Sequence, residues 1–426
     1  MEQTLTFKIG TRTQQVRLPA EVLLGVLEPN AVELPAAGEE ERVRAALARP
    51  TGSPRLRDIV KPGETVAIVT SDVTRPMPTW KVLPALLDEL YAGGVCREDI
   101  ILVFALGSHR GHTEEEKRRL AGERAWGEIA CVDLDPADCV HIGVTGRGTP
   151  VDIDRRVAEA DRRVCLGNIE YHYFAGYSGG AKAIMPGVST RAAIQANHSR
   201  MVQPAAHAGK LEGNPVREDI EEAAAMVGVD FILNVVLDAR KEIIHAAAGD
   251  VTAAHRAGCA FLDTLYQVPI PRRADIVLVS QGGAPKDLNL YQTQKALDNA
   301  KHAVRPGGVI ILMGSCAEGL GEKTFEEWMT SAPTARSLID RIRREFRLGG
   351  HKAAAIAMVL EEADIYLVSD LEDALVERLF MKPFHSVQEA YDTAARKLGP
   401  GASVLAMPYG GSTLPALRQP AESRRS

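Results

Sequence analysis

The chain has 426 residues, of which 45% are hydrophobic and 25% are charged, and its formal net charge is −6. This balance is typical of a globular protein long enough for two domains, and it excludes a strongly basic nucleic-acid-binding protein. The N-terminus lacks an apolar signal core, and no run approaches the roughly 18 apolar residues of a membrane span. We therefore expect a cytoplasmic protein that binds neither nucleic acid nor membrane.

The N-terminal part of the chain predicts strands that alternate with helices. Residues 4–18 indicate a hairpin, and Glu39–Ala48 predicts a short helix. Apolar runs bounded by polar loops predict the strands Val66–Thr70, Ile100–Leu106, Ile129–Val132, His141–Val144 and Val164–Asn168. Other segments predict the helices Trp80–Tyr91, Glu114–Ala125 and Thr190–His198. Thr113, with Glu116 three residues later, indicates a capping box at the start of the second of these helices.

A hairpin over Phe231–Leu237 and Glu242–Ala246, followed by a helix over Val251–Tyr266, completes this part. The segment QVPIPRRAD, residues 267–275, is rich in proline and arginine and predicts a linker. A second α/β unit follows, with predicted strands Ile276–Ser280, Val309–Met313, Ile365–Val368 and Ser403–Met407. Its predicted helices are Leu290–Val304, 324–346, 352–361 and Ser386–Leu398. The polar tail AESRRS, residues 421–426, carries no prediction.

Strands separated by helices indicate an α/β fold with mostly parallel sheets covered on both faces. We predict two α/β domains with the active site in the cleft between them. The first spans residues 1–267, joined by the C-terminal segment 400–426, and the second spans residues 275–398. The six cysteines are scattered without a CxxC pair, so we interpret them as buried thiols rather than disulfide partners or zinc ligands.

Three polar loops follow predicted strands, at residues 71–79, 107–113 and 170–187. Ligands of parallel sheets bind outside the carboxyl ends of the strands, so we expect these loops to form the site. The third loop combines Lys182 with several glycines, which allow positive φ angles and close approach of the backbone to an anion. A Walker loop would place Ser or Thr after the lysine, but Ala183 stands there. We expect this loop to be exposed at a strand end.

His109, His172 and His198 lie in or next to these loops. Imidazole is the side chain best suited to proton transfer and metal binding near neutral pH, so these three are candidate functional residues. We interpret His112 as a loop surface residue, His141 as a strand residue without a chemical role, and the remaining histidines, including His255, as surface residues.

Two further groups of side chains admit two interpretations. Arg75 follows Asp72 by three residues, which indicates either an ion pair within the loop or a guanidinium that binds a carboxylate or phosphate. In the segment YQTQK, Tyr291 precedes Gln292, which shares one helical face with Lys295. That face is either solvated or part of a binding site.

Several of these segments together resemble the nickel-pincer lactate racemase family. The matching stretches are SDVTRP, GSHR, HYFAGYSGGAK, the pair Asn197-His198 and YQTQK, in the order that the family has them. The resemblance implies a racemase or epimerase that inverts Cα of a lactate-like 2-hydroxy acid by hydride transfer. It also implies nickel held by pyridinium-3-thioamide-5-thiocarboxylic acid mononucleotide, which is tethered to a lysine and supplied by cofactor-maturation proteins.

The resemblance assigns roles residue by residue. It implies that Lys182 is the tether, that His198 is the nickel ligand, and that His109 and His172 are the acid/base pair. The implied cofactor-binding residues, all in the first domain, are Lys182, Asp72, Arg75, Ser178, Gly179 and Gly180. The implied substrate-binding residues are Arg75, Tyr291, Gln292 and Lys295. The sequence leaves open whether the chain forms a homo-oligomer.

The chain departs from the family in one segment. Family members place a large aromatic side chain near the substrate from the region after residue 350, but no aromatic residue lies between Phe346 and Tyr366 here. We therefore expect a different pocket for the substrate side chain, and the particular 2-hydroxy acid stays open.

Three alternatives from other classes remain at this point. A nicotinamide-dependent dehydrogenase should show GxGxxG between a first strand and helix, and no predicted strand ends in that way. A pyridoxal-phosphate enzyme could form a Schiff base with Lys182, which a visible absorbance band would detect. A non-catalytic anion-binding module would lose no function when His109 or His172 is replaced.

Overall fold

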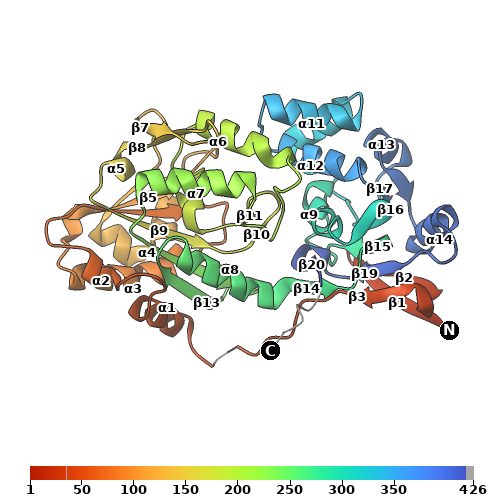
Figure 1. Cartoon of the computed structure of the whole chain (residues 1–426), viewed down its shortest axis with the longest axis horizontal. Coiled ribbons are helices and arrows are strands. Elements are labelled where there is room, and N and C mark those ends of the chain that lie inside the picture. The colour runs from red at the N-terminus through yellow and green to blue at the C-terminus, as the bar shows by residue number, and fades with distance from the viewer. Residues whose placement is uncertain (35, 419–426) are drawn as a thin grey trace, which may run out of the picture. The chain divides into compact units, whose positions relative to one another are not determined.

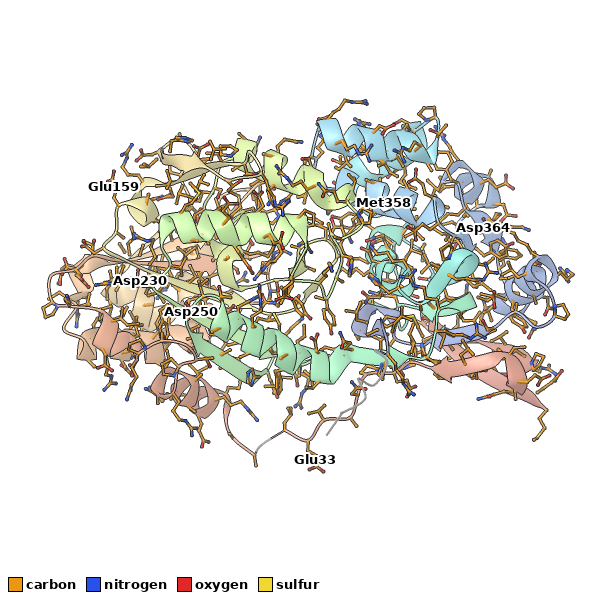
Figure 2. The ribbon with its side chains drawn as sticks, viewed as in Figure 1. Glu33, Glu159, Asp230, Asp250, Met358 and Asp364 are labelled. Atoms are coloured by element: carbon orange, nitrogen blue, oxygen red, sulfur yellow. The ribbon has the colours of Figure 1, made fainter. Side chains whose placement is uncertain are left out.

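The computed structural model describes residues 1–34 and 36–418 (Figure 1). It consists of two compact units. Residues 32–263 form one, here called the N-terminal unit, and residues 1–31 with the chain from 264 onward form the other, the C-terminal unit. Figure 2 draws the side chains and marks the N-terminal unit by Glu159 and Asp230 and the C-terminal unit by Met358 and Asp364. Within the described chain, no helix combines the length and apolar character needed to cross a bilayer.

The two ends of the chain correct the predicted domain division. Residues 1–31 and the segment from 400 onward were assigned to the first domain, but they belong to the C-terminal unit. Strand β19 (Val404–Met407) pairs in parallel with both β15 (Ala274–Ser280) and β3 (Leu23–Val26). These pairs extend the sheet of the C-terminal unit, and such a long-range pairing has no signature in the local sequence. Residues 419–426, including the polar tail, lie outside the described residues.

A six-stranded sheet of order β13-β12-β9-β4-β5-β6 forms the centre of the N-terminal unit. Its strands are β4 (Val66–Ser71), β5 (Ile100–Ala105), β6 (Ala130–Asp133), β9 (Arg162–Asn168), β12 (Phe231–Leu237) and β13 (Ile243–Gly249). All neighbours are parallel except β12 and β13, which form the predicted hairpin. Val66 to Val69 are fully buried, as the apolar runs of a sheet covered on both faces should be. The predicted mostly parallel α/β fold is confirmed.

One predicted strand belongs to a different sheet. The segment His141–Val144 was expected to continue the main sheet, but β7 (Cys139–Val144) pairs in antiparallel fashion with β8 (Pro150–Asp154) alone. The connection between them is short, so the two strands remain neighbours in a hairpin. Much of β7 is exposed, with Val144 at 54%, which a central strand of a covered sheet would not be.

The helices of the N-terminal unit are α1 (Glu39–Ala48), α2 (Leu56–Ile59), α3 (Thr79–Ala92), α4 (Glu114–Glu128), α5 (Arg155–Ala158), α6 (Arg191–His198), α7 (Pro215–Val227) and α8 (Ala253–Tyr266). Helices α1, α3 and α4 contribute to a hydrophobic core on one face of the sheet, where Ile68, Leu102 and Leu166 lie. The short helix η3 (Gly180–Ala183) contacts β4, β9 and α7. The third candidate loop is therefore packed against the sheet.

The C-terminal unit contains a wholly parallel six-stranded sheet of order β18-β17-β16-β15-β19-β3. Its remaining strands are β16 (Val304–Met313), β17 (Asp364–Val368) and β18 (Lys382–Phe384). Its helices are α9 (Leu290–Ala300), α10 (Lys323–Ser331), α11 (Ala335–Arg344), α12 (Gly350–Leu360), α13 (Asp373–Arg378) and α14 (Val387–Leu398). The predicted helix over 324–346 is two helices, because Pro333 interrupts the backbone hydrogen bonds and Thr334 caps α11.

Two small pairs of strands complete the C-terminal unit. The predicted N-terminal hairpin is confirmed as β1 (Glu2–Ile9) and β2 (Arg12–Pro19). The predicted linker over 267–275 is wrong in its first half, because β14 (Gln267–Ile270) pairs in parallel with β20 (Leu414–Leu417). Pro269 is tolerated there because a strand with a single neighbour can leave one side without N–H donors.

The predicted capping box at α4 is confirmed, and it allows a stability test. Thr113 Oγ1 accepts a hydrogen bond from Glu116 N at 3.2 Å, and the Glu116 carboxylate accepts one from Thr113 N at 2.9 Å. Thr113→Ala should lower the free energy of unfolding of the N-terminal unit by about 1 kcal/mol. Chemical denaturation, with hydrogen exchange to localise the effect to the first turn of α4, measures it. Thr113→Ser keeps the oxygen and is the matched control; equal losses in both variants would contradict the cap.

Candidate active site

The three candidate loops meet at one edge of the N-terminal sheet. Strand β4 pairs in parallel with β5 on one side and β9 on the other, so the loops that follow these strands emerge at the same edge. Gly107 N in the second loop donates to Gly187 O in the third at 2.9 Å. The predicted convergence of the loops is therefore confirmed.

Asp72 and His109 join the first two loops. The buried Asp72 carboxylate lies 2.7 Å from His109 Nδ1 and accepts a hydrogen bond from Thr74 Oγ1 at 2.8 Å. Burial alone would raise the pKa of Asp72, but the hydrogen bonds from His109 and Thr74 and the charge of Arg75 lower it. An ionised Asp72 fixes the proton on Nδ1 of His109, so the lone pair lies on Nε2, where a base can accept a proton.

Arg75 does not form the ion pair with Asp72 that the sequence left open. Its side chain is exposed, and within residues 1–34 and 36–418 it forms no ion pair. Its charge nevertheless acts on both Asp72 and Lys182. A guanidinium in this position can bind an anion near both residues.

His112 was interpreted as a surface residue, and that interpretation is wrong. Its side chain is fully buried, with Nδ1 at 2.7 Å from the Asp133 carboxylate. Its Nε2 accepts a hydrogen bond from Val73 N at 3.0 Å. His112 thus ties the first loop to the second and to the end of β6, which holds Asp72 beside His109. The available signal was Asp133, a carboxylate at the end of a predicted strand.

Phe174 brings three of the candidate residues together in the third loop. The centroid of its buried ring lies 4.5 Å from that of His172 and 4.9 Å from that of His198. Lys182 Nζ lies 6.0 Å from the same ring centroid. One aromatic side chain is thus surrounded by an amine and two imidazoles. Residues 172 and 198, which carry the imidazoles, are 26 positions apart in the sequence.

Lys182 lies on η3 and is half-buried. Burial, followed by the positive charges of Arg75 and Arg217, lowers its pKa well below the ordinary value for lysine. A lowered pKa increases the fraction of neutral amine, the form that acts as a nucleophile. The expectation that this loop is exposed is wrong, because Phe174 to Tyr177, Gly180 and Ala181 are buried.

The glycines before Lys182 are required by the close packing of the loop. Gly180 N donates to Asn234 Oδ1 at 2.7 Å. A Cβ atom on Gly179 would lie 2.6 Å from that oxygen, and one on Gly180 would lie 2.8 Å from the His255 ring. Both glycines also have positive φ angles, 76° and 58°. The hydroxyl of Ser178, an implied cofactor-binding residue, donates to Asn168 O at 2.7 Å and so braces the loop itself.

His255 was also interpreted as a surface residue, but it is fully buried. Its Nε2 donates to Ser178 O at 2.8 Å, and its Nδ1 accepts from the buried guanidinium of Arg217 at 2.8 Å. Burial and the charge of Arg217 hold the pKa of His255 well below its usual value, so it stays neutral. The signal for burial was its place beside Ala254 and Cys259 on the apolar face of α8.

The tautomer of His198 is fixed by two buried residues. Asn197 Nδ2 donates to Asp219 Oδ2 at 2.7 Å and to Val216 O at 3.1 Å, so Asn197 Oδ1 faces His198 Nδ1 at 2.8 Å. Nδ1 therefore carries the proton and Nε2 the lone pair. Metal-binding histidines are commonly oriented in this way by a hydrogen bond at the other ring nitrogen. His198 is thus prepared to donate one nitrogen to a metal.

His172 has a different arrangement from His109. It lies on β10 (Tyr171–His172), which pairs with β11 (Gly176–Tyr177), and its Nδ1 accepts a hydrogen bond from Ala175 N at 3.2 Å. The loop thereby orients the ring through Nδ1, and because Nδ1 accepts, the neutral ring carries its proton on Nε2.

The remaining candidate residues lie in the C-terminal unit. Tyr291, Gln292 and Lys295 occupy the first turns of α9, which Asn289 caps by accepting from Gln292 N at 3.0 Å. Lys295 is exposed, whereas Tyr291 is half-buried with its ring 5.6 Å from that of Phe325.

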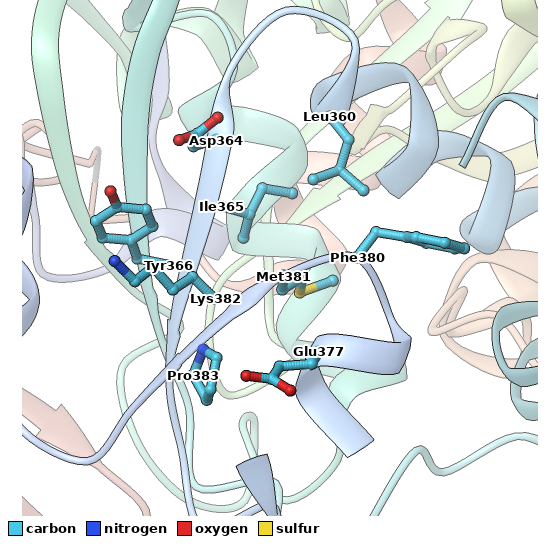
Figure 3. Close-up of a pocket in the computed structure, with 9 residues that line it drawn as sticks. All are labelled: Leu360, Asp364, Ile365, Tyr366, Glu377, Phe380, Met381, Lys382 and Pro383. Atoms are coloured by element: carbon cyan, nitrogen blue, oxygen red, sulfur yellow. The ribbon is translucent and has the colours of Figure 1, made fainter. Parts of the chain in front are cut away.

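A hollow elsewhere in the C-terminal unit contains none of the candidate residues. It is lined by Leu360, Asp364, Ile365, Tyr366, Glu377, Phe380, Met381, Lys382 and Pro383 (Figure 3). Asp364 and Lys382 begin β17 and β18, so this hollow lies at the amino ends of the parallel strands. Ligands of such sheets bind at the opposite edge, and we assign no function to it.

Comparisons with known proteins agree with these observations. Family models described as the lactate racemase N-terminal domain and C-terminal domain match residues 9–209 and 270–414. The chain is 34% identical to the lactate racemase of Thermoanaerobacterium thermosaccharolyticum, over 93% of this chain and 95% of that protein. It is also 34% identical to the lactate racemase of Lactiplantibacillus plantarum, over 87% of this chain and 90% of that protein.

Solved structures give the same result. The lactate racemase apoprotein from Thermoanaerobacterium thermosaccharolyticum matches with a TM-score of 0.84 and 33% identity, covering 98% of this chain and all of that one. A Thermotoga maritima protein matches with a TM-score of 0.58 at 19% identity, over 89% of this chain and 98% of that one, which shows a shared fold alone. The matches define the chain as an enzyme of the isomerase class. It belongs to the lactate racemase family.

The hydrogen bonds around His198 lead to a test in the protein without any cofactor. In Asn197→Ala, Nδ1 of His198 loses its acceptor, so the Nδ1–H tautomer should no longer dominate. Nitrogen-15 chemical shifts of the imidazole measure the two tautomers directly. Ser199→Ala, which removes only a hydroxyl bonded to Ala196 O, is the matched control on the same helix end. An unchanged tautomer in Asn197→Ala would show that Asn197 does not set it.

Proposed function

We propose that this chain racemises a lactate-like 2-hydroxy acid with a nickel-pincer cofactor, the pyridinium mononucleotide described above, tethered to Lys182. The observation that carries the proposal is the cluster around Phe174, where an amine, a candidate metal ligand and a candidate acid/base group meet. Membership of the lactate racemase family supports the same activity.

The residues present fit the chemistry of such a cofactor. Lys182 has a lowered pKa, which favours the neutral amine that a covalent amide-type link requires. His198 offers one nitrogen lone pair, on Nε2, since Asn197 holds its Nδ1. A single imidazole is fewer protein ligands than catalytic metals usually have, and a bound pincer group would supply the remaining donors.

When bound, this cofactor would supply the hydride acceptor and donor that inversion of the substrate Cα requires. Side chains of the protein perform the proton transfers and hold the substrate. His109 Nε2 takes the hydroxyl proton of one enantiomer, and Asp72, ionised and 2.7 Å from Nδ1, stabilises the imidazolium that results. His172 serves the opposite enantiomer; its Nε2 carries the proton while Nδ1 accepts from Ala175 N, so the ring changes tautomer before Nε2 acts as the base.

The substrate carboxylate needs cations, and the chain offers several. Arg75 is exposed and forms no ion pair with another described residue, so its planar guanidinium is available for a bidentate contact. Lys295 contributes a second positive charge, and Tyr291 and Gln292 contribute hydroxyl and amide groups on the same turns of α9. Holding the carboxylate fixes Cα and its hydroxyl relative to the acid/base groups.

The proposed tether and the proposed metal ligand should be separable. Protein produced together with cofactor-maturation proteins should carry a covalent adduct on Lys182 and an equimolar amount of nickel. Lys182→Ala should lose adduct, nickel and racemisation, whereas His198→Ala should keep the adduct and lose the nickel. Intact mass, peptide mapping and metal analysis measure these outcomes.

Lys61→Ala, a substitution of an exposed lysine in the same unit, is the control and should keep both adduct and nickel. An adduct mapped to another residue of active enzyme, or nickel retained in His198→Ala, would refute the corresponding assignment.

The two acid/base assignments can be tested with single enantiomers. Either His109→Ala or His172→Ala should stop net racemisation, because both half-reactions are needed for inversion. Each variant should still react in a single turnover with the enantiomer whose base remains. D- and L-substrate deuterated at Cα, with the cofactor absorbance followed over one turnover, separate the two half-reactions. If both variants react equally with both enantiomers, the histidines only position the substrate.

A further inference from the structure

Lys352 is a buried cation that the mechanism above does not use. It is the third residue of α12, and its side chain is 6% exposed. Its Nζ donates to Tyr291 O at 2.5 Å and lies 3.9 Å from the centroid of the Tyr291 ring. Fully buried lysines are rare unless an acid pairs with them. Among residues 1–34 and 36–418, no carboxylate forms an ion pair with this ammonium group.

A second lysine lies close enough to act on the first. Burial, followed by the positive charge of Lys295, lowers the pKa of Lys352 to about 7, and only Asp298 opposes this shift. The Asp298 carboxylate is itself engaged by Lys301 at 2.8 Å and by Gln294 at 3.0 Å. An ammonium group has three donors, and the carbonyl of Tyr291 accepts one of them. An anion bound here would satisfy the remaining donors and reduce the repulsion between the two lysines.

The packing of α12 fixes Lys352 in this place. Gly350 lies against the Trp328 ring so closely that a Cβ atom would be 2.6 Å from it. Lys352 is followed by the small buried side chains Ala353 to Ala355, and α12 packs against α9 and α10. The start of α12 therefore presents a cation, rather than a bulky apolar group, to the face of Tyr291.

We propose that Lys352 binds a second carboxylate of the substrate, and that the preferred substrate is a 2-hydroxydicarboxylic acid. This inference rests on the proposed function, in which Tyr291 and Lys295 contact a 2-hydroxy acid. Within the C-terminal unit, Lys295 takes the carboxylate beside the reacting carbon, and Lys352 takes the carboxylate at the other end. A methyl group, as in lactate, cannot accept hydrogen bonds from a buried ammonium group, whereas a carboxylate can.

The test uses nickel-loaded enzyme and three acids: 2-hydroxybutanedioate, its 4-methyl ester and lactate. The ester has a similar shape but no second charge, so it isolates the effect of the second carboxylate. Wild-type enzyme should racemise the dicarboxylate with a kcat/KM about 10- to 100-fold above that for the ester, the size expected for a charge-assisted hydrogen bond. Chiral chromatography of the products measures each rate.

Lys352→Met keeps much of the side-chain volume and removes the charge, so the ratio of kcat/KM for the dicarboxylate to that for lactate should fall by a similar factor. Lys323→Met replaces an exposed lysine at the start of α10 and serves as the control, with the ratio unchanged. A wild-type preference for lactate or the ester, or an unchanged ratio in Lys352→Met, would overturn the inference. Racemisation of lactate alone would leave the proposed function intact, whereas racemisation of none of the three by loaded enzyme would refute both.

Discussion

The parallel pairing of β4 with β5 and β9 is the constraint on which the candidate active site depends. It directs three loops, separated by long stretches of sequence, to one edge of the N-terminal sheet. Buried hydrogen bonds then join the loops, from His109 to Asp72 and from Val73 to His112. The sheet gives the loops a common position, and the polar side chains give them a fixed geometry.

The same device orients two imidazoles of this unit, because a neighbour holds the Nδ1 atom of each. Asp72 holds Nδ1 of His109, and Asn197 holds Nδ1 of His198. In both, Nε2 carries the lone pair, which suits a base in the first and a metal ligand in the second. His255 differs, since both of its nitrogens are engaged by Ser178 and Arg217. A ring with both nitrogens engaged supports the loop, whereas a ring held at one nitrogen can still do chemistry.

The sequence predicted what depends on local pattern. Buried strands, the capping box at Thr113 and the loops that carry His109 and Lys182 follow from short-range periodicity and from the rules of parallel sheets. What could not be predicted depends on partners far away in the chain. The pairing of β19 with β3 joins Val404 to Leu23, which is 381 positions away. No local sequence signal indicates this pairing. The burial of His112 by Asp133 and Val73 was missed for the same reason.

The lowered pKa of Lys182 reduces the stability of the folded chain, and attachment of the cofactor would remove this effect. Burial lowers the pKa of Lys182 in the folded chain, so the unfolded chain binds a proton that the folded chain binds less well. The resulting loss of stability is complete below the folded-state pKa, and it disappears only as the pH rises towards the ordinary lysine value of about 10.4. At neutral pH the loop therefore contains an amine that destabilises the fold. Acylation of that amine, as the proposed tether requires, removes the charge permanently and with it the unfavourable protonation equilibrium. The low pKa of Lys182 both destabilises the fold before the cofactor is attached and makes the amine reactive. One environment therefore sets stability and reactivity at this position.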